Sequence, residues 1–261
     1  MIQDNQALLF RLLGECLGSF HPRVIFDIGS RDGNESMRFA ERYPDARIFA
    51  FECHPELLPA CRDALAPFRG IELVPRAVSL VTGRIPFFPI DHARSRVDSP
   101  DGNPGASSIL RASGKYVCET YVQNEVTVPS TRLDHFCAQR GIAHPDLMWM
   151  DIQGAELDAL RSLGARLASC SLLHVEVEFV EIYAGQALFP EVREYLEAGG
   201  WSFAGFTSYS RYFADAVFLN DRAFGRAALR CAKDVLGTAR LIWKYRRHAL
   251  KRRIRALAGL S

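Results

Sequence analysis

Three acidic residues stand where the sequence predicts that buried strands end. Asp27, Glu52 and Asp151 each close a short apolar run of the kind that forms a buried parallel strand. In an open α/β sheet, ligands bind outside the carboxyl ends of the strands, where loops and helix N-termini converge. A carboxylate there can accept hydrogen bonds from a ligand or remove a proton from it. We therefore expect these three carboxylates to surround one binding site.

The segment Asp27-Ile28-Gly29-Ser30-Arg31-Asp32-Gly33 predicts a tight turn after the first strand. Its two glycines allow sharp backbone curvature and close approach of a ligand. Glu52 ends the next strand, where a carboxylate can accept the two hydroxyls of a ribose. The phosphate-binding pattern G-x-G-x-x-G is absent, which disfavours a dehydrogenase. The arrangement instead suits a nucleoside ligand without a pyrophosphate, such as S-adenosylmethionine.

The elements that position these residues alternate along the chain, which predicts a parallel sheet covered by helices. The apolar runs 23–28, 47–52, 71–74, 125–129, 145–151 and 172–179 read as strands, and 34–43, 55–66, 133–140, 155–163 and 190–198 read as helices. Residues 201–206 and 212–219 predict an antiparallel hairpin at the sheet edge, and 77–79 with 84–88 predict a second extended pair. Residues 89–114 lack periodicity and predict an irregular insert, either a lid or a disordered excursion.

Five blocks of sequence together resemble the FkbM-type S-adenosylmethionine-dependent methyltransferases. They are residues 27–36, Phe51-Glu52-Cys53-His54-Pro55 with Ala77-Val78, Ser107-Ser108-Ile109, 128–134 and Met150-Asp151-Ile152-Gln153-Gly154-Ala155-Glu156. The resemblance extends over residues 22–206. It implies a class I methyltransferase fold of the Rossmann-like α/β class, with a mostly parallel seven-stranded sheet and helices on both faces. It also implies O-methylation, often of sugars or of polyketide and glycan hydroxyls.

The sequence departs from the family pattern at two places. Ser30-Arg31 replaces the usual Ala-Asn after the first glycine, and Gln153 replaces the first glutamate of Asp-x-Glu-Gly-Ala-Glu. Cofactor binding through backbone amides is expected to survive the first change. The second removes a negative charge beside the expected base. It keeps open an alternative, in which the chain is a catalytically silent binding module recruited to a membrane-associated glycan-assembly complex.

The resemblance assigns the cofactor contacts to the first three strand ends. The turn would hold the methionine portion of the cofactor, and Asp27 would attract its ammonium group. Glu52 would bind the ribose. Ala77, beside Arg76, would border the adenine. The expected cofactor-binding set is Asp27, Gly29, Ser30, Gly33, Glu52 and Ala77. Ser107 and Ser108 are expected to line the acceptor cleft, although a plain turn also explains them. Arg31 and Asp32 read as an exposed turn pair.

Methyl transfer from a sulfonium is an in-line displacement, so the site needs alignment and a group that removes the hydroxyl proton. Asp151, Glu178 and His174 are the candidate bases. The last two share one strand face with Glu176. A core histidine bonded to a backbone carbonyl is the alternative for His174. Asp151, Glu178 and Glu156 could together hold a divalent cation, but we favour a site without metal.

The net charge of +2 conceals an uneven distribution. From residue 222 to the end there are 12 Lys and Arg against one acid, while residues 1–221 hold 20 basic and 29 acidic residues. Apolar residues recur at helical spacing in this basic segment, at Leu229, Ala232, Leu236, Ala239, Trp243, Leu250, Ile254 and Leu257. We therefore divide the chain into an N-terminal helix (1–21), a methyltransferase domain (22–220) and a basic amphipathic helical tail (221–261).

The basic charge and the apolar stripe of the tail predict that residues 222–258 contact an anionic membrane surface. Alternatively, the apolar stripe of the tail packs on the domain itself or on a second copy of the chain, which would form a homo-oligomer. No nucleic acid is expected as a partner. The seven cysteines are scattered without a C-x-x-C pair, so neither a structural disulfide nor a zinc cluster is expected. We interpret the chain as a cytoplasmic O-methyltransferase, peripheral at the inner face of the membrane through its tail, that acts on a hydroxyl of a sugar, glycan or glycolipid.

Overall fold

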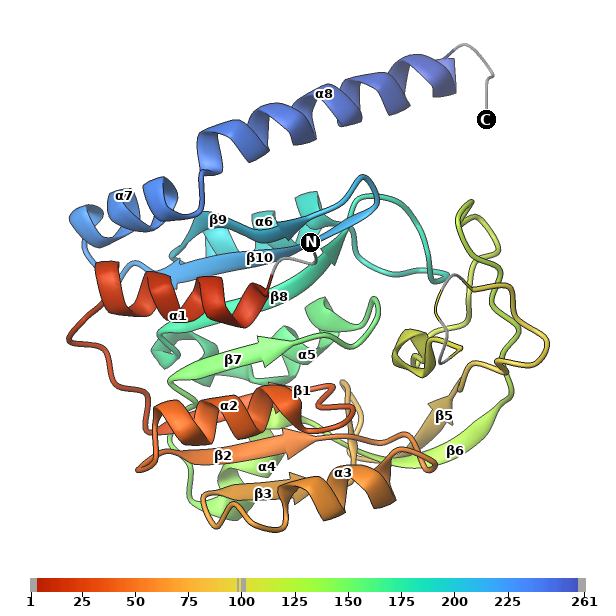
Figure 1. The fold of residues 1–261 in the computed structure, drawn as a ribbon, viewed down its shortest axis with the longest axis horizontal. Helices are drawn as coiled ribbons and strands as arrows, with labels where there is room; N and C mark the ends of the chain where they lie inside the picture. Colours follow the sequence, from red (N-terminus) through yellow and green to blue (C-terminus); the bar gives the residue numbers. More distant parts are fainter. Residues whose placement is uncertain (1–3, 98, 100–101, 258–261) are drawn as a thin grey trace.

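A twisted sheet forms the centre of the computed structural model, which describes residues 4–97, 99 and 102–257 (Figure 1). Within this part of the chain the sheet has seven strands. All pairings are parallel except those of the last strand, β10, which is antiparallel to both its neighbours. In spatial order the strands are β3 (Ile71–Val74), β2 (Arg47–Phe51), β1 (Val24–Ile28), β7 (Leu147–Met150), β8 (Leu172–Glu178), β10 (Phe213–Asn220) and β9 (Trp201–Tyr209).

Helices cover both faces of this sheet, and their apolar sides form two large hydrophobic clusters. One cluster lies under α1 (Asn5–Cys16), α2 (Asn34–Arg42) and α7 (Arg226–Val235). The other lies under α4 (Leu133–Arg140), α5 (Glu156–Ser162), the 3-10 turn η2 (Gly164–Ser169) and α6 (Phe189–Ala198). Helix α3 (Leu58–Leu65) packs beside β3. The predicted α/β architecture, including the antiparallel edge hairpin, is confirmed.

A small second sheet differs from the prediction. Residues 77–79 and 84–88 were expected to pair with each other, but β4 (Ala77–Val78) and β5 (Gly83–Phe87) both pair with β6 (Val126–Thr131), which lies between them. The intervening insert contains the 3-10 turn η1 (Pro104–Ala106) and isolated bridges such as Phe88 with Ser108. Its described residues lie beyond the carboxyl ends of the central strands, which the arrowheads in Figure 1 mark.

The basic tail is two helices rather than the single one expected. Gly237, at φ +58°, separates α7 from α8 (Thr238–Leu257), because this left-handed conformation ends a helix. The break lies against the edge strand β9, where the Thr238 hydroxyl donates to the carbonyl of Ala204. Helix α7 packs on one sheet face and the first half of α8 on the other. The expected apolar stripe is therefore divided, and Ile254 and Leu257 have side chains outside the described part.

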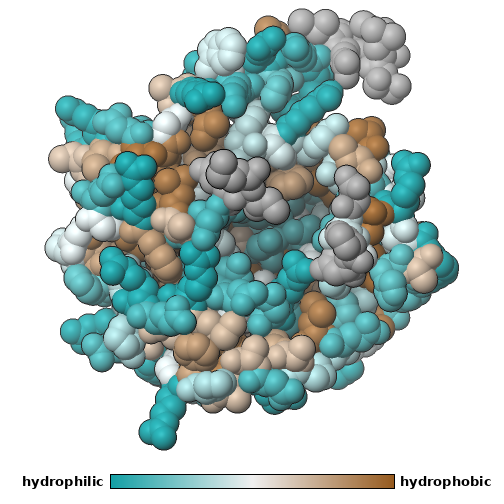
Figure 2. All heavy atoms as spheres, viewed as in Figure 1, coloured by the Kyte–Doolittle hydropathy of each residue, from teal (hydrophilic) through white to brown (hydrophobic). Residues whose placement is uncertain are grey.

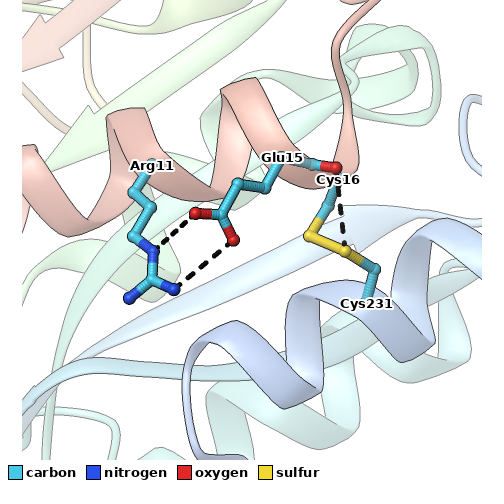
Figure 3. Close-up of a disulfide and its surroundings, with 4 residues drawn as sticks. All are labelled: Arg11, Glu15, Cys16 and Cys231. Carbon is cyan, nitrogen blue, oxygen red and sulfur yellow. Dashed lines mark hydrogen bonds and ion pairs between the residues drawn. A yellow bond between two sulfur atoms is a disulfide. The ribbon is translucent and has the colours of Figure 1, made fainter.

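A disulfide joins α1 to α7, in contrast to the sequence expectation (Figure 3). Cys16 and Cys231 are 215 residues apart in sequence, and their Cα atoms lie 5.5 Å apart. No local spacing signals this pair, because it forms only once the first and seventh helices pack side by side. Cys53, Cys61, Cys118, Cys137 and Cys170 are free thiols.

Breaking this disulfide should destabilise the chain. Because the bond closes a long loop, its loss should lower the free energy of unfolding by about 2–4 kcal/mol. Urea unfolding of Cys16→Ser and of wild type with dithiothreitol should show the same loss, while Cys118→Ser, which removes an exposed free thiol, should not. Titration of seven free thiols in the unreduced, denatured protein would contradict the pairing.

Candidate active site

A cavity of about 330 Å³ opens where the central strands end and the insert covers them. Its volume lies in the range of small-molecule sites. Segments that follow β1, β2, β3, β7 and β8 contribute to its wall, as does the insert. The expected site residues that line it are Gly29, Glu52, Ala77, Ser107, Ser108, Asp151 and Glu178.

The turn after β1 contributes the backbone of Gly29 and the exposed Arg31 to the cavity, while Asp27 and Ser30 support the turn from behind. Gly29 has φ +88°, and a Cβ atom there would lie 1.9 Å from the carbonyl oxygen of Asp151, so only glycine fits. Asp27 is fully buried and accepts hydrogen bonds from the hydroxyls of Ser30 (2.8 Å) and Ser36 (2.5 Å). Gly33 packs on Leu65. Asp27, Ser30 and Gly33 thus shape the turn without lining the cavity.

Glu52 presents a carboxylate that the backbone holds in place. Its Oε1 accepts the N–H groups of Cys53 (2.7 Å) and His54 (2.6 Å), and its Oε2 accepts the N–H of Arg31 (2.8 Å). Burial raises the pKa of Glu52, and these three donors oppose that rise. Each carboxylate oxygen has two lone pairs, so Oε2 retains one with which to accept a hydroxyl. The residue is 8% exposed and lines the cavity, which fits a ribose contact.

The segment after β3 completes this end of the cavity, and the insert forms a further part of its wall. Ala77 and Arg76 both line it, as the resemblance implies for residues that border the adenine. Ser108 donates to the carbonyl of Gln153 (2.8 Å), and the hydroxyl of Ser107 accepts the N–H of Ile90 (3.0 Å). Both serines line the cavity, but their hydroxyls also fasten the insert to its neighbours.

Acidic side chains gather at the opposite end, beyond β7 and β8. Asp151 is exposed and lines the cavity with Glu176. Gln153, at φ +57°, donates from Nε2 to Asp151 Oδ1 and to Glu176 Oε2, both at 2.6 Å. A glutamate at position 153 would bring a third carboxylate against these two. The departure from the family pattern is therefore accommodated, because the amide bridges two groups that would otherwise repel.

Two deeper carboxyl groups lie beside this pair. Glu156 and Glu178 are each 2% exposed, and burial is the main cause that raises the pKa of both, to about 8 for Glu156. Glu156 accepts the N–H of Ile152 (2.9 Å) and so fixes the loop after β7. One oxygen of Glu178, Oε1, has no hydrogen-bond donor among the described residues.

His174 does not join the other two candidate bases. It is fully buried, its ring stacks on Trp149 at 3.6 Å between centroids, and its Nε2 bonds the hydroxyl of Thr207 at 2.7 Å. Burial lowers its pKa to about 3, so the ring is neutral. It lies further from the carboxyl end of β8 than Glu178 and is not among the cavity-lining residues. We therefore do not propose it as a base.

Two tyrosines between residue 114 and β6 line the cavity and were not expected from the sequence. Tyr116 and Tyr121 lie 6.2 Å apart between ring centroids, and both face the cavity with Glu119. The hydroxyl of Tyr183 lies 2.6 Å from the carbonyl oxygen of Ala106 and 2.9 Å from Gln153 Oε1, and its single proton can be donated to either, which ties η1 to the acidic end. These residues lie in segments without periodicity, so no sequence signal placed them at the site.

The buried state of Asp27 predicts a pH dependence of stability. Burial raises its pKa from 3.8 to about 7. Because the folded carboxyl keeps its proton up to about pH 7 and the unfolded one loses it near pH 4, the free energy of unfolding should fall as pH rises between these values. This fall amounts to about 4 kcal/mol for one such group. Asp27→Asn should remove it, whereas Asp63→Asn, on the exposed side of α3, should not. Identical pH profiles for wild type and Asp27→Asn would contradict this reading.

Comparison with known proteins gives one family. Residues 27–204 match the methyltransferase FkbM domain. Over 166 residues the chain is 32% identical to the 2-O-methyltransferase NoeI of Sinorhizobium fredii (strain NBRC 101917 / NGR234), a match that spans 62% of this chain and 66%, just under two thirds, of that protein.

Two solved structures are similar to parts of the chain. Precorrin-6y C5,15-methyltransferase from Geobacter metallireducens GS-15 is similar over 82% of this chain and 87% of its own, with 16% identity and a TM-score of 0.43. The fibrillarin pre-rRNA processing protein of Methanococcus jannaschii is similar over 76% of this chain and 66% of its own, with 12% identity and a TM-score of 0.47.

The family match begins at Asp27 and includes Glu52 and Asp151, so it contains all three carboxylates predicted at the ends of buried strands. It extends over more than half of the chain, and the described residues form the expected mostly parallel seven-stranded sheet. The chain therefore belongs to the FkbM family of S-adenosylmethionine-dependent methyltransferases.

Proposed function

We propose that the chain transfers a methyl group from S-adenosylmethionine to a hydroxyl oxygen of a sugar, glycan or glycolipid. The observation that carries this proposal is a single cavity with two chemically distinct ends. The Glu52 carboxylate lines one end, and Asp151 with Glu176 lines the other. The name of the relative, a 2-O-methyltransferase, supports transfer to an oxygen.

The Glu52 end suits the methyl donor. When bound, S-adenosylmethionine supplies an electrophilic methyl group on a positively charged sulfur. Glu52 Oε2 accepts a ribose hydroxyl while its Oε1 stays fixed by backbone N–H groups. The glycine turn after β1 brings backbone close to the ligand, since Gly29 carries no Cβ atom. The chain thus fixes the donor mainly by shape and by one charged acceptor, which is how alignment lowers a displacement barrier.

The acidic end suits a polyhydroxylated acceptor. Asp151 removes the proton of the attacking hydroxyl, because it is the exposed carboxylate of this end. Gln153 Nε2 holds Asp151 Oδ1, which fixes the orientation of this side chain. Tyr116 and Tyr121 offer ring faces and hydroxyls together, which fit a sugar that is apolar on its C–H face and polar at its edge.

Incubation with methyl-labelled S-adenosylmethionine and the glycolipid and polysaccharide fractions of the source cell tests this proposal. We expect label in one carbohydrate fraction, recovered as an O-methyl sugar after hydrolysis. Asp151→Asn serves as the control that binds the donor and transfers slowly. Binding of the donor without labelling of any fraction would favour the silent binding module instead.

We further propose that α8 places the enzyme against an anionic membrane surface. Its outward face carries four basic residues and two exposed apolar ones, namely Arg240, Arg246, Arg247, Lys251, Trp243 (61% exposed) and Leu250 (59% exposed). At 100° per residue these six lie within one sector of the helix, opposite Leu241, Ile242 and Tyr245, which pack on the core. Figure 2 shows a mostly hydrophilic surface along this helix, at the upper edge of the view.

This composition is typical of helices that lie in the headgroup zone of a bilayer. Within the described residues, none of the helices combines the length and apolar character needed to cross a bilayer.

Vesicle sedimentation with full-length variants tests the α8 surface. Each basic residue near an anionic bilayer contributes about 1 kcal/mol, so Arg246→Ala with Arg247→Ala should weaken binding to phosphatidylserine vesicles by about 30-fold. Arg62→Ala with Arg69→Ala removes the same charge from exposed positions in and after α3, at the far end of the molecule in Figure 1, and should leave binding unchanged. Equal weakening by the two pairs would show that only net charge matters.

A further inference from the structure

Three glutamates converge beneath the acidic end of the cavity. Glu156 comes from the start of α5, and Glu176 and Glu178 come from the end of β8. Each offers a carboxylate oxygen, and these oxygens all lie within 4.8 Å of one another. This spacing matches oxygen atoms that share one coordination sphere, because a cation with oxygen ligands at 2.0–2.6 Å holds them at most about twice that distance apart.

One carboxylate oxygen of the cluster lacks a hydrogen-bond donor of normal geometry among the described residues. Glu178 is 2% exposed and lines the cavity, and its Oε1 accepts no hydrogen bond of normal geometry from any described residue, although the Gln186 side chain lies close enough to lower the pKa of Glu178. The other two glutamates do have donors, since Glu156 accepts the N–H of Ile152 and Glu176 accepts the amide of Gln153. A buried carboxylate oxygen without a donor is costly. A positively charged ligand would satisfy it.

We propose that Glu156, Glu176 and Glu178 bind a divalent cation, Mg²⁺ or Mn²⁺, at the acceptor end of the cavity. Several buried carboxylates at this distance repel one another unless they share protons or a cation. An all-oxygen ligand set selects hard cations over zinc or copper. This site includes Glu156 and Glu178 of the set considered from the sequence, with Glu176 in place of Asp151.

The cation gives the acidic end a second role, which rests on the proposed function. An acceptor hydroxyl that coordinates it would be oriented and made more acidic, so that Asp151 removes its proton at neutral pH. Gln153 contributes indirectly. Its amide turns Glu176 Oε2 toward Asp151, and this connects the cation ligands to the base.

Titration of the full chain with Mn²⁺, followed by electron paramagnetic resonance, tests the site without donor or acceptor present. Wild type should bind one Mn²⁺ per chain, and Mg²⁺ should displace it. Glu178→Gln should weaken binding at least about tenfold, because the isosteric amide removes a ligand charge. Glu194→Gln, which removes an exposed carboxylate of α6, should bind as wild type does. Glu156→Gln is the second test variant, and each variant's thermal unfolding shows that it is folded.

The absence of a bound Mn²⁺ in wild type at millimolar metal would overturn this site, and so would equal binding by wild type and Glu178→Gln. Neither result depends on methyl transfer. Unchanged donor binding in a folded Glu52→Ala variant, with intact Mn²⁺ binding, would count against the proposed function alone.

Discussion

Replacing Glu52 with alanine should weaken the binding of S-adenosylmethionine and of S-adenosylhomocysteine at least about 100-fold. A hydrogen bond to a charged group contributes about 1.5–3 kcal/mol, so the loss of the ribose bond to Glu52 Oε2 alone raises the dissociation constant by about 10- to 150-fold. The substitution also leaves the N–H groups of Arg31, Cys53 and His54 without their acceptor, so the turn that holds the donor loosens.

Isothermal titration measures this effect directly. Glu56→Ala is the matched control, because it removes an exposed glutamate four positions later in the same segment. A folded Glu52→Ala protein that binds either compound within threefold of wild type would show that the ribose contact lies elsewhere.

Replacing Asp151 with asparagine should lower kcat by about 10²- to 10⁴-fold, the usual contribution of a positioned general base. The amide oxygen can still accept from Gln153 Nε2, so the loop after β7 should keep its shape. Donor affinity should therefore change little. This separation of kcat from donor binding distinguishes a base from a residue that only shapes the cavity.

Single-turnover rates and donor affinity, measured on the same preparation, provide the check. Asp158→Asn removes a partly buried acid from α5 and should leave both unchanged. A kcat within threefold of wild type for Asp151→Asn would remove this residue from the mechanism and direct attention to Glu176, the other carboxylate that Gln153 contacts.

The sequence predicted those parts of the fold that depend on local pattern. The strands ending near Asp27, Glu52 and Asp151 are continuous apolar runs, and their carboxyl ends meet because parallel strands must share an edge. Glu52 and Asp151 could be placed at the cavity for this reason alone. Asp27 ends the same kind of strand, but its side chain turns behind the glycine turn toward Ser30 and Ser36.

Features that depend on distant segments could not be predicted. Adjacency in sequence favoured pairing of β4 with β5, yet β6, some 40 residues after β5, lies between them. The disulfide requires α1 and α7 to meet, and the break at Gly237 turns α8 to the other sheet face. At the site, Gln153 donates hydrogen bonds to both Asp151 and Glu176 from a left-handed backbone conformation. A glutamine in the sequence does not indicate that conformation.

A crystal structure of the full chain with S-adenosylhomocysteine tests the proposed donor site at the strand ends most directly. We predict the compound in the cavity at the strand ends, with a ribose hydroxyl on Glu52 Oε2, the adenine beside Ala77, and the sulfur directed toward Asp151. Binding of the compound at any other surface, or a ribose that makes no contact with Glu52, would show that the donor site lies elsewhere.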